Sequence, residues 1–138
     1  MIWFCQGATK ADMSTRVLVV DDNFVNVKLL EALLKSASYE VATAMSGDAA
    51  LEEVRQFRPD IVLLDVMMPE MDGYEVCRRI RQIKEAARVP VIMITALDKD
   101  SDRETGFAAG ANDFLTKPVE DSVLLPAMRR VMQSANAR

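Results

Sequence analysis

Three short runs in which every residue is apolar constrain the fold of this chain more than any other feature. They are Val17–Val20, Ile61–Leu64 and Val91–Ile94. Runs of this kind are typical of strands buried on both faces, as in the centre of a parallel sheet. Two weaker strand candidates, Val41–Ala44 and Asp113–Thr116, bring the expected number of strands to five.

Between these runs, apolar residues recur every three or four positions, as they do on one face of a helix. The first series are Val27, Leu30 and Leu34; Ala50, Val54 and Phe57; and Val76, Ile80 and Ile83. Strands that alternate with such helices predict an α/β fold, in which repeated strand–helix units surround a parallel sheet.

The last two helices carry irregularities. The segment Ser101–Ala109 contains Gly106 and offers little apolar surface, so we expect it to be the loosest helix. Gly110 is well placed to end that helix as a left-handed cap. The final helix is expected over Asp121–Gln133, where Pro126 predicts either a kink or a late helix start.

Length and charge limit the chain to one domain and exclude some partners. The chain has 138 residues, half of them hydrophobic, which is enough for one compact core. We expect a flexible leader over residues 1–15, a domain over residues 16–133 and a polar tail over residues 134–138. The net charge is -4, and 17 basic residues are scattered among 21 acidic ones, which argues against direct nucleic-acid binding.

The apolar runs are too short to insert into a membrane, and the first residues lack the features of a signal peptide. Cys5 and Cys77 lie far apart without metal-ligand spacing, which favours two free thiols in a reducing compartment. We therefore expect a cytoplasmic protein. The chain contains no histidine, so its chemistry must use carboxylates, hydroxyls and lysine.

The candidate functional residues follow successive predicted strands at the same end. Asp21 and Asp22 follow the first strand, Asp65 the third, Thr95 the fourth and Lys117 the fifth. Ligands of open α/β sheets bind outside these strand ends, where the strand order reverses. In a sheet of order 2-1-3-4-5 the reversal lies between strands one and three, so the three carboxylates would meet in one crevice.

Each of these residues has an ordinary alternative as a turn, a helix cap or a surface charge. Their coincidence at corresponding strand ends favours a joint site. Two carboxylates about 4 Å apart repel by roughly 4 kcal/mol at an effective dielectric near 20, so the cluster needs cations. Mg²⁺ suits oxygen ligands in an open crevice, and Lys117 supplies a second positive charge. With Thr95 as hydrogen-bond donor, Asp65 could then attack phosphorus and form an acyl phosphate.

Across about Arg16–Met132, the sequence resembles the receiver domains of two-component signalling, which belong to the CheY-like superfamily. The matching stretches are VLVVDDN from residue 17, DIVLLDVMMPEMDG from residue 60, ITA from residue 94 and GANDFLTKP from residue 110. The resemblance implies a doubly wound, flavodoxin-like receiver fold with five parallel strands in the order 2-1-3-4-5.

The resemblance also implies roles for individual residues. Asp65 would accept a phosphoryl group from a histidine kinase or a histidine phosphotransfer protein. Asp22, Asp65 and the backbone carbonyl of Met67 would bind Mg²⁺, with Asp21 helping through water. Lys117–Pro118 would be a cis peptide that aims the lysine at the phosphate.

As a switch, the resemblance implies that Thr95 moves toward the phosphoryl group while Phe114 turns inward and repacks the face made by the fourth helix, fifth strand and fifth helix. Phe114 is alternatively an ordinary core residue of an edge strand. The apolar Met67 stands where the family's residue influences water access, so we expect it to lengthen the life of the acyl phosphate.

Other functions remain open. An aspartyl magnesium phosphatase would carry Asp-x-Asp, whereas this chain has Asp65-Val66-Met67, and a flavin or nucleotide module would need a Gly-rich loop after strand one. We thus expect a switch rather than a turnover enzyme, acting on a downstream target or effector domain and able to form a homodimer. The chain also resembles receivers that precede diguanylate cyclase domains, and a phosphorylation-independent binding module is a further alternative.

Overall fold

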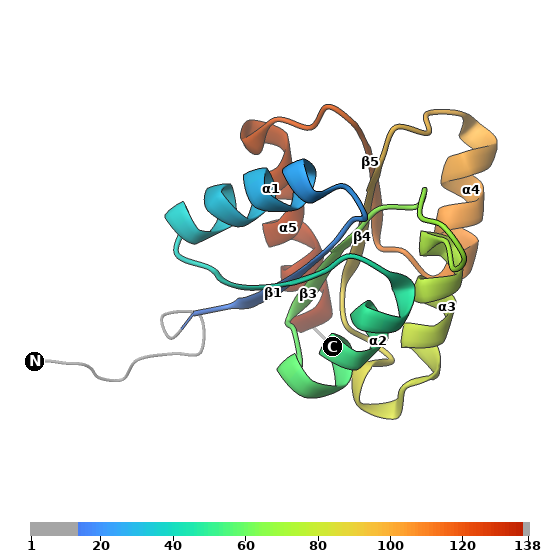
Figure 1. Ribbon diagram of the computed structural model, residues 1–138, viewed down its shortest axis with the longest axis horizontal. Helices are drawn as coiled ribbons and strands as arrows, with labels where there is room; N and C mark the ends of the chain where they lie inside the picture. The colour runs from blue at the N-terminus through green and yellow to red at the C-terminus, as the bar shows by residue number, and fades with distance from the viewer. Residues whose placement is uncertain (1–13, 137–138) are drawn as a thin grey trace, which may run out of the picture.

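The computed structural model describes residues 14–136, in which five strands alternate with five α-helices (Figure 1). The strands are β1 (Arg16–Val20), β2 (Glu40–Ala44), β3 (Ile61–Leu64), β4 (Val91–Thr95) and β5 (Asp113–Thr116). The helices are α1 (Phe24–Ser36), α2 (Gly47–Phe57), α3 (Gly73–Gln82), α4 (Asp100–Ala109) and α5 (Asp121–Asn136), with a short 3-10 helix, η1, over Lys84–Ala86. Cys5 and all of the expected leader except residues 14 and 15 lie outside the described residues.

The strands form one parallel sheet in the order β2-β1-β3-β4-β5, which confirms the predicted fold. β1 pairs with β2 on one side and β3 on the other, so Val17 lies opposite both Val41 and Ile61. This arrangement explains why the middle runs are apolar throughout, because β1 residues from Val17 to Val20 are at most 1% exposed.

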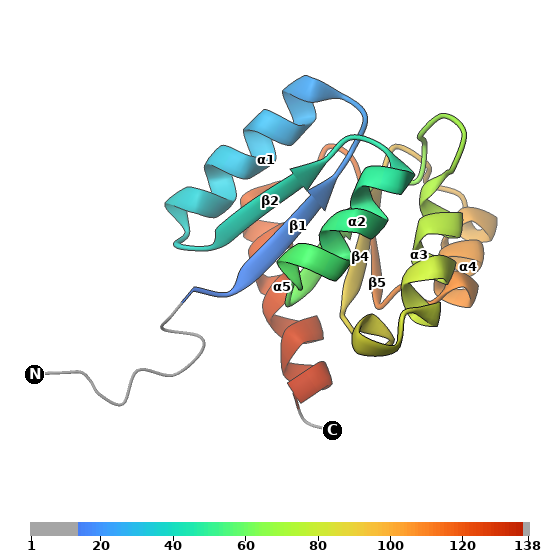
Figure 2. The ribbon, with the colours of Figure 1, turned by 60° about the horizontal axis from the view of Figure 1, so that its bottom comes forward.

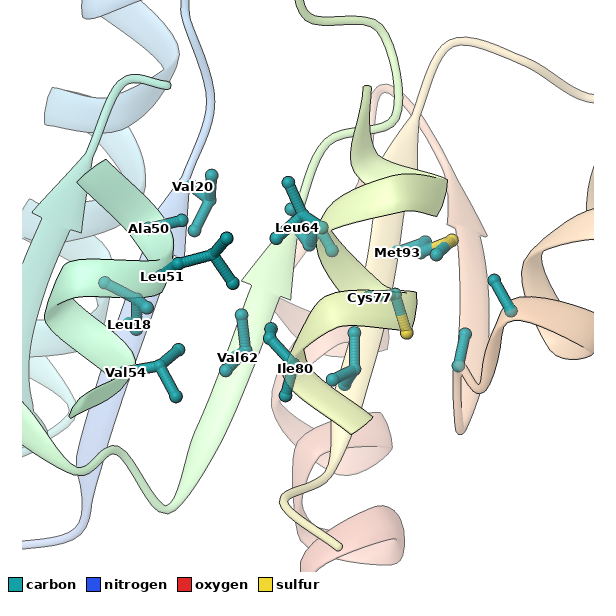
Figure 3. Close-up of a cluster of buried hydrophobic side chains, with 14 of the residues drawn as sticks. Leu18, Val20, Ala50, Leu51, Val54, Val62, Leu64, Cys77, Ile80 and Met93 are labelled. Carbon is teal, nitrogen blue, oxygen red and sulfur yellow. The ribbon is translucent and has the colours of Figure 1, made fainter. Parts of the chain in front are cut away.

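Helices α1 and α5 cover one face of the sheet, and α2, α3 and α4 cover the other (Figures 1 and 2). The alternating side chains of the strands divide between two hydrophobic cores. Figure 3 shows the core under α2 and α3, where Leu18, Val62 and Met93 from the sheet meet Leu51 and Ile80 from the helices. Cys77 also lies in this core as a buried free thiol.

Side-chain caps begin the first three α-helices. The side chain of Asn23 accepts a hydrogen bond from the N–H of Asn26 at the start of α1. Ser46 and Asp72 cap α2 and α3 in the same way. The caps of α1 and α2 follow the ends of β1 and β2 within three residues, whereas a longer loop separates the end of β3 at Leu64 from the cap Asp72.

The structure changes two expectations for the last helix, α5, and confirms one for α4. α5 begins at Asp121 and continues through Pro126 to Asn136, so the late start and the end at Gln133 were wrong. Burial of its apolar face in the core outweighs the backbone hydrogen bond that proline lacks. Gly110 ends α4 with a φ of 112°, as predicted.

Helix α4 is anchored to α3 at both of its ends. Tyr74 Oη donates to the carbonyl of Asp102 at 3.0 Å, and Arg81 donates to the carbonyl of Gly110 at 2.6 and 3.1 Å. These contacts restrain α4, and the expectation that it is the loosest helix stays a prediction. Within residues 14–136, no helix has the length and apolar character required to cross a membrane.

Candidate functional site

Three carboxylates converge where β1 and β3 end. Carboxylate oxygens of Asp21, Asp22 and Asp65 all lie within 4.8 Å of one another. They meet because β1 and β3 are neighbouring parallel strands in register, with Val20 opposite Leu64. The structure thus brings together the acidic residues that the sequence placed at corresponding strand ends.

Two of these carboxylates are buried. Asp21 is 2% exposed and Asp65 is 7% exposed, whereas Asp22 is exposed. Asp21 accepts hydrogen bonds from the backbone N–H of Asn23 at 2.9 Å and the side-chain amide of Asn26 at 3.3 Å. These donated hydrogen bonds hold the Asp21 carboxylate in place at the end of β1.

Lys117 connects the two buried acids. Its Nζ atom lies 2.8 Å from Asp21 Oδ2 and 3.1 Å from Asp65 Oδ2. Partial burial acts to lower the pKa of Lys117, but the hydrogen bonds and charges of the two aspartates outweigh this effect and raise the pKa above its ordinary value. The ammonium group is therefore charged at neutral pH. The peptide bond between Lys117 and Pro118 is cis.

One lysine leaves the cluster short of positive charge. Three carboxylates face a single ammonium group, and the exposed Asp22 leaves the cluster open to solvent on one side. A hard divalent cation with oxygen ligands suits this donor set, since Mg²⁺ takes one or two carboxylates and keeps several waters. The residues present therefore fit a magnesium ion.

Thr95 ends β4, next to β3 in the sheet, and it is fully buried. Its hydroxyl oxygen accepts a hydrogen bond from the backbone N–H of Leu97 at 3.4 Å, and its carbonyl accepts one from the N–H of Lys117 at 2.8 Å. The hydroxyl proton is not used by the contact with Leu97, so Thr95 can still donate a hydrogen bond.

Met67 contacts Asp65 through its backbone. The N–H of Met67 donates to Asp65 Oδ1 at 3.2 Å, while its side chain is 56% exposed. This contact orients the Asp65 carboxylate from the loop that follows β3.

Phe114, the candidate switch residue, lies inside the structure, where its side chain is 1% exposed. It sits on β5 opposite Met93 of β4. This inward position fits both the switch and the ordinary core interpretation of Phe114.

Sequence reasoning assigned no role to Gly73, which the structure places directly behind Asp65. A Cβ atom at Gly73 would lie 2.2 Å from the carbonyl oxygen of Asp65 and 2.7 Å from Cα of Val66. The N–H of Gly73 donates to the carbonyl of Val66 at 2.8 Å. A glycine that opens a helix eight residues after a candidate nucleophile is a signal that could have pointed to this close approach.

Comparison with known proteins agrees with the site. The family model of the response regulator receiver domain matches residues 17–129. The chain therefore belongs to the receiver domain family of two-component response regulators, which are phosphorylation-dependent signalling switches.

Similar curated proteins are response regulators. The chain is 52% identical over 117 residues to response regulator PleD of Caulobacter vibrioides, covering 85% of this chain and 26% of PleD. It is 42% identical over 106 residues to the alkaline phosphatase synthesis transcriptional regulatory protein PhoP of Bacillus subtilis, covering 77% of this chain and 43% of PhoP. The chain thus spans about a quarter to a half of these relatives.

Similar solved structures share the whole fold. The chemotaxis protein CheY4 of Vibrio cholerae matches with a TM-score of 0.82 and 33% identity, covering 86% of this chain and 98% of that one. The receiver domain of sensor histidine kinase PA1611 from Pseudomonas aeruginosa matches with a TM-score of 0.81 and 36% identity, covering 87% and 98%. That domain has a magnesium ion coordinated in its active-site cleft.

Proposed function

We propose that Asp65 accepts a phosphoryl group from a phosphohistidine partner. The observation that carries this proposal is the buried acidic pair that shares Lys117, with Asp65 Oδ2 3.1 Å from the ammonium group. The pair lies at the point of strand-order reversal, where doubly wound sheets bind ligands.

In the transfer, a carboxylate oxygen of Asp65 forms a bond to phosphorus while the bond from phosphorus to the histidine nitrogen of the donor breaks. The electron pair of that bond returns to the imidazole, so the ionised Asp65 needs no general base. Lys117 draws charge off the phosphoryl oxygens, and Thr95 donates a hydrogen bond to one of them.

Asp21, Asp22, Asp65 and the backbone carbonyl of Met67 would hold Mg²⁺. When bound, the ion neutralises charge on the phosphoryl oxygens. The magnesium site of the PA1611 receiver domain supports this assignment. Asp21, which already accepts two hydrogen bonds, fits a ligand that acts through water better than the exposed Asp22 does.

The donor that we propose is a histidine kinase or a histidine phosphotransfer protein, as expected for a member of the response regulator receiver family. A cavity of about 410 Å³ beside Lys117 supports docking of the donor next to the site. It is lined by Leu29, Leu30 and Leu33 of α1 and by Pro118 and Val119 after β5. We assign this reaction to the cytoplasm.

Phosphorylation would then repack the α4–β5–α5 face through Thr95 and Phe114 and change how that face binds a downstream target, an effector domain or a second copy of the chain. The likeness to PleD supports a receiver within a longer regulator, for example with a diguanylate cyclase output. The protein would promote its own phosphorylation and dephosphorylation without turning over other substrates, since Met67 replaces the second acid of an aspartyl phosphatase.

Intact mass spectrometry after incubation with acetyl phosphate tests this function. We expect a gain of one phosphoryl group that requires Mg²⁺, is labile to base and is absent in Asp65→Asn. Asp48→Asn, an exposed acid on α2, serves as the matched control and should still gain the group. No gain by the folded, magnesium-saturated protein would favour the phosphorylation-independent binding module instead.

A further inference from the structure

The ring of Phe114 packs between Met93 of β4 and Gly106 of α4. A Cβ atom at Gly106 would lie 2.9 Å from Cδ2 of the Phe114 ring and 3.0 Å from Sδ of Met93. The helix can approach the ring this closely only because position 106 carries no side chain. Gly106, which weakens α4 as an isolated helix, therefore provides space for the inward ring.

Arg103 contacts Phe114 in two ways from the same helix. Its guanidinium carbon lies 5.4 Å from the centre of the Phe114 ring, within the range of a cation–π interaction. Its Nη1 atom also donates to the carbonyl oxygen of Phe114 at 3.0 Å. One side chain thus holds both the ring and the backbone of this residue.

The backbone contact matters because β5 is an edge strand with a single neighbour, β4. The N–H of Phe114 donates to Asp113 Oδ1 at 2.8 Å, and its carbonyl accepts from Arg103. Polar backbone groups on a sheet edge need partners from outside the sheet. At Phe114, side chains supply those partners.

The same stretch of β5 leads into the phosphorylation site. In the pairing of β4 with β5, Met93 lies opposite Phe114 and Thr95 lies opposite Thr116. Lys117 follows directly, and its N–H donates to the carbonyl of Thr95 at 2.8 Å. Phe114 on β5 and Lys117, which directly follows β5, are therefore three residues apart in the chain.

We propose that Arg103 is a positioning residue that holds Phe114 inward and thereby couples the phosphorylation site to the α4–β5–α5 face. The coupling rests on the proposed phosphorylation of Asp65. The contacts by which Arg103 holds the Phe114 ring do not depend on it. Removing Arg103 would release the ring without touching the acidic cluster. In a protein without Arg103, phosphorylation would have to order the Phe114 ring as well. In the wild-type protein Arg103 already holds that ring in place.

The hold is tested by NMR on protein whose phenylalanine rings are labelled with ¹³C, in the absence of Mg²⁺. The chain has five phenylalanines, and Phe114→Leu assigns the resonance of interest. We expect Arg103→Ala to shift and broaden the Phe114 signal, and Arg103→Lys, which keeps a cation, to restore it in part. Glu104→Ala, an exposed neighbour on α4, is the matched control. An unchanged Phe114 signal in Arg103→Ala would overturn the proposal.

The coupling is tested with beryllofluoride and Mg²⁺, since beryllofluoride activates the related DrrB and RstA receiver domains. We expect Arg103→Ala to weaken beryllofluoride binding about tenfold, the combined effect of one cation–π contact and one charged hydrogen bond. In a Phe114→Leu background the same substitution should cost less, because its ring contact is gone. Equal losses in both backgrounds, or no loss, would overturn the coupling. If the wild-type protein did not bind beryllofluoride, the proposed function would fail, and the ring spectrum alone would decide the role of Arg103.

Discussion

The ammonium group of Lys117 lies 3.1 Å from Asp65 Oδ2, although the two residues are 52 positions apart in the chain. Because the same Nζ atom also contacts Asp21, one lysine neutralises part of a cluster that would otherwise repel itself. Lys117 thus links the ends of β1 and β3, and we expect the residues of the site to make separable contributions to stability and to chemistry.

We expect Lys117→Met to destabilise the magnesium-free protein by about 1–3 kcal/mol, since it leaves two buried carboxylates without their cation. Lys35→Met removes an exposed contact with Glu31 and should cost at most about 0.5 kcal/mol. Urea unfolding at neutral pH measures both. Equal stability of Lys117→Met and the wild-type protein would contradict the role of this ion pair.

The same contact predicts a pH dependence. The pKa of Lys117 is raised in the folded protein, because its hydrogen bonds to the aspartates outweigh partial burial. Its stabilisation is then fully present below the pKa of an unfolded lysine and is lost as pH rises through the folded pKa. The stability difference between wild type and Lys117→Met should therefore be constant near neutral pH and shrink in strong base. A difference that grew in base would contradict the sign.

Asp22 should contribute to metal binding more than to folding, because it is the exposed member of the acidic cluster. We expect Asp22→Asn to weaken Mg²⁺ binding by about tenfold or more, as loss of a charged oxygen ligand should. Its magnesium-free melting temperature should not fall, since a like charge has been removed. Calorimetric titration with Mg²⁺ and thermal unfolding check the two parts, and unchanged Mg²⁺ affinity would rule out Asp22 as a ligand.

Gly73→Ala should be among the most damaging single-methyl changes near the site. Its new Cβ would meet backbone atoms of Asp65 and Val66, which cannot rotate away, so we expect a loss of about 3 kcal/mol or more. Gly47→Ala is the matched comparison, because its Cβ would meet side-chain atoms of Met71 and no backbone atom, and we expect a smaller loss of about 1–2 kcal/mol. Denaturant unfolding of both variants would refute this account if the two losses were equal.

Met67 should lengthen the life of the acyl phosphate, because an apolar side chain next to Asp65 limits the approach of water. We expect Met67→Asn to lose its phosphoryl group several-fold faster, whereas Met67→Leu should resemble the wild type. The decay of the phosphorylated form, followed by mass spectrometry after removal of acetyl phosphate, measures both rates. An unchanged rate in Met67→Asn would sink the idea.

The sheet and the position of the site could be predicted because short-range patterns determine them. Fully apolar runs such as Ile61–Leu64 indicate central parallel strands, and the carboxyl ends of such strands must lie together. That logic predicts that Asp21, Asp22 and Asp65 meet in one crevice, with Lys117 as a nearby cation.

Contacts that depend on tertiary packing could not be predicted from the sequence. Pro126 lies inside α5 because burial of the apolar face outweighs one missing hydrogen bond. Gly106 weakened the prediction of α4, yet it makes room for Phe114. The contact of Arg103 with the same ring has no local signal, since an arginine on a helix usually faces solvent.

Reduction of the phosphorylated protein with borohydride, followed by peptide sequencing, tests the central claim most directly. Borohydride converts an aspartyl phosphate to homoserine and leaves free carboxylates unchanged, so it marks the residue that carried the phosphoryl group. The account predicts homoserine at position 65 and aspartate at positions 21 and 22. Homoserine at either of those two positions, or at none, would contradict it.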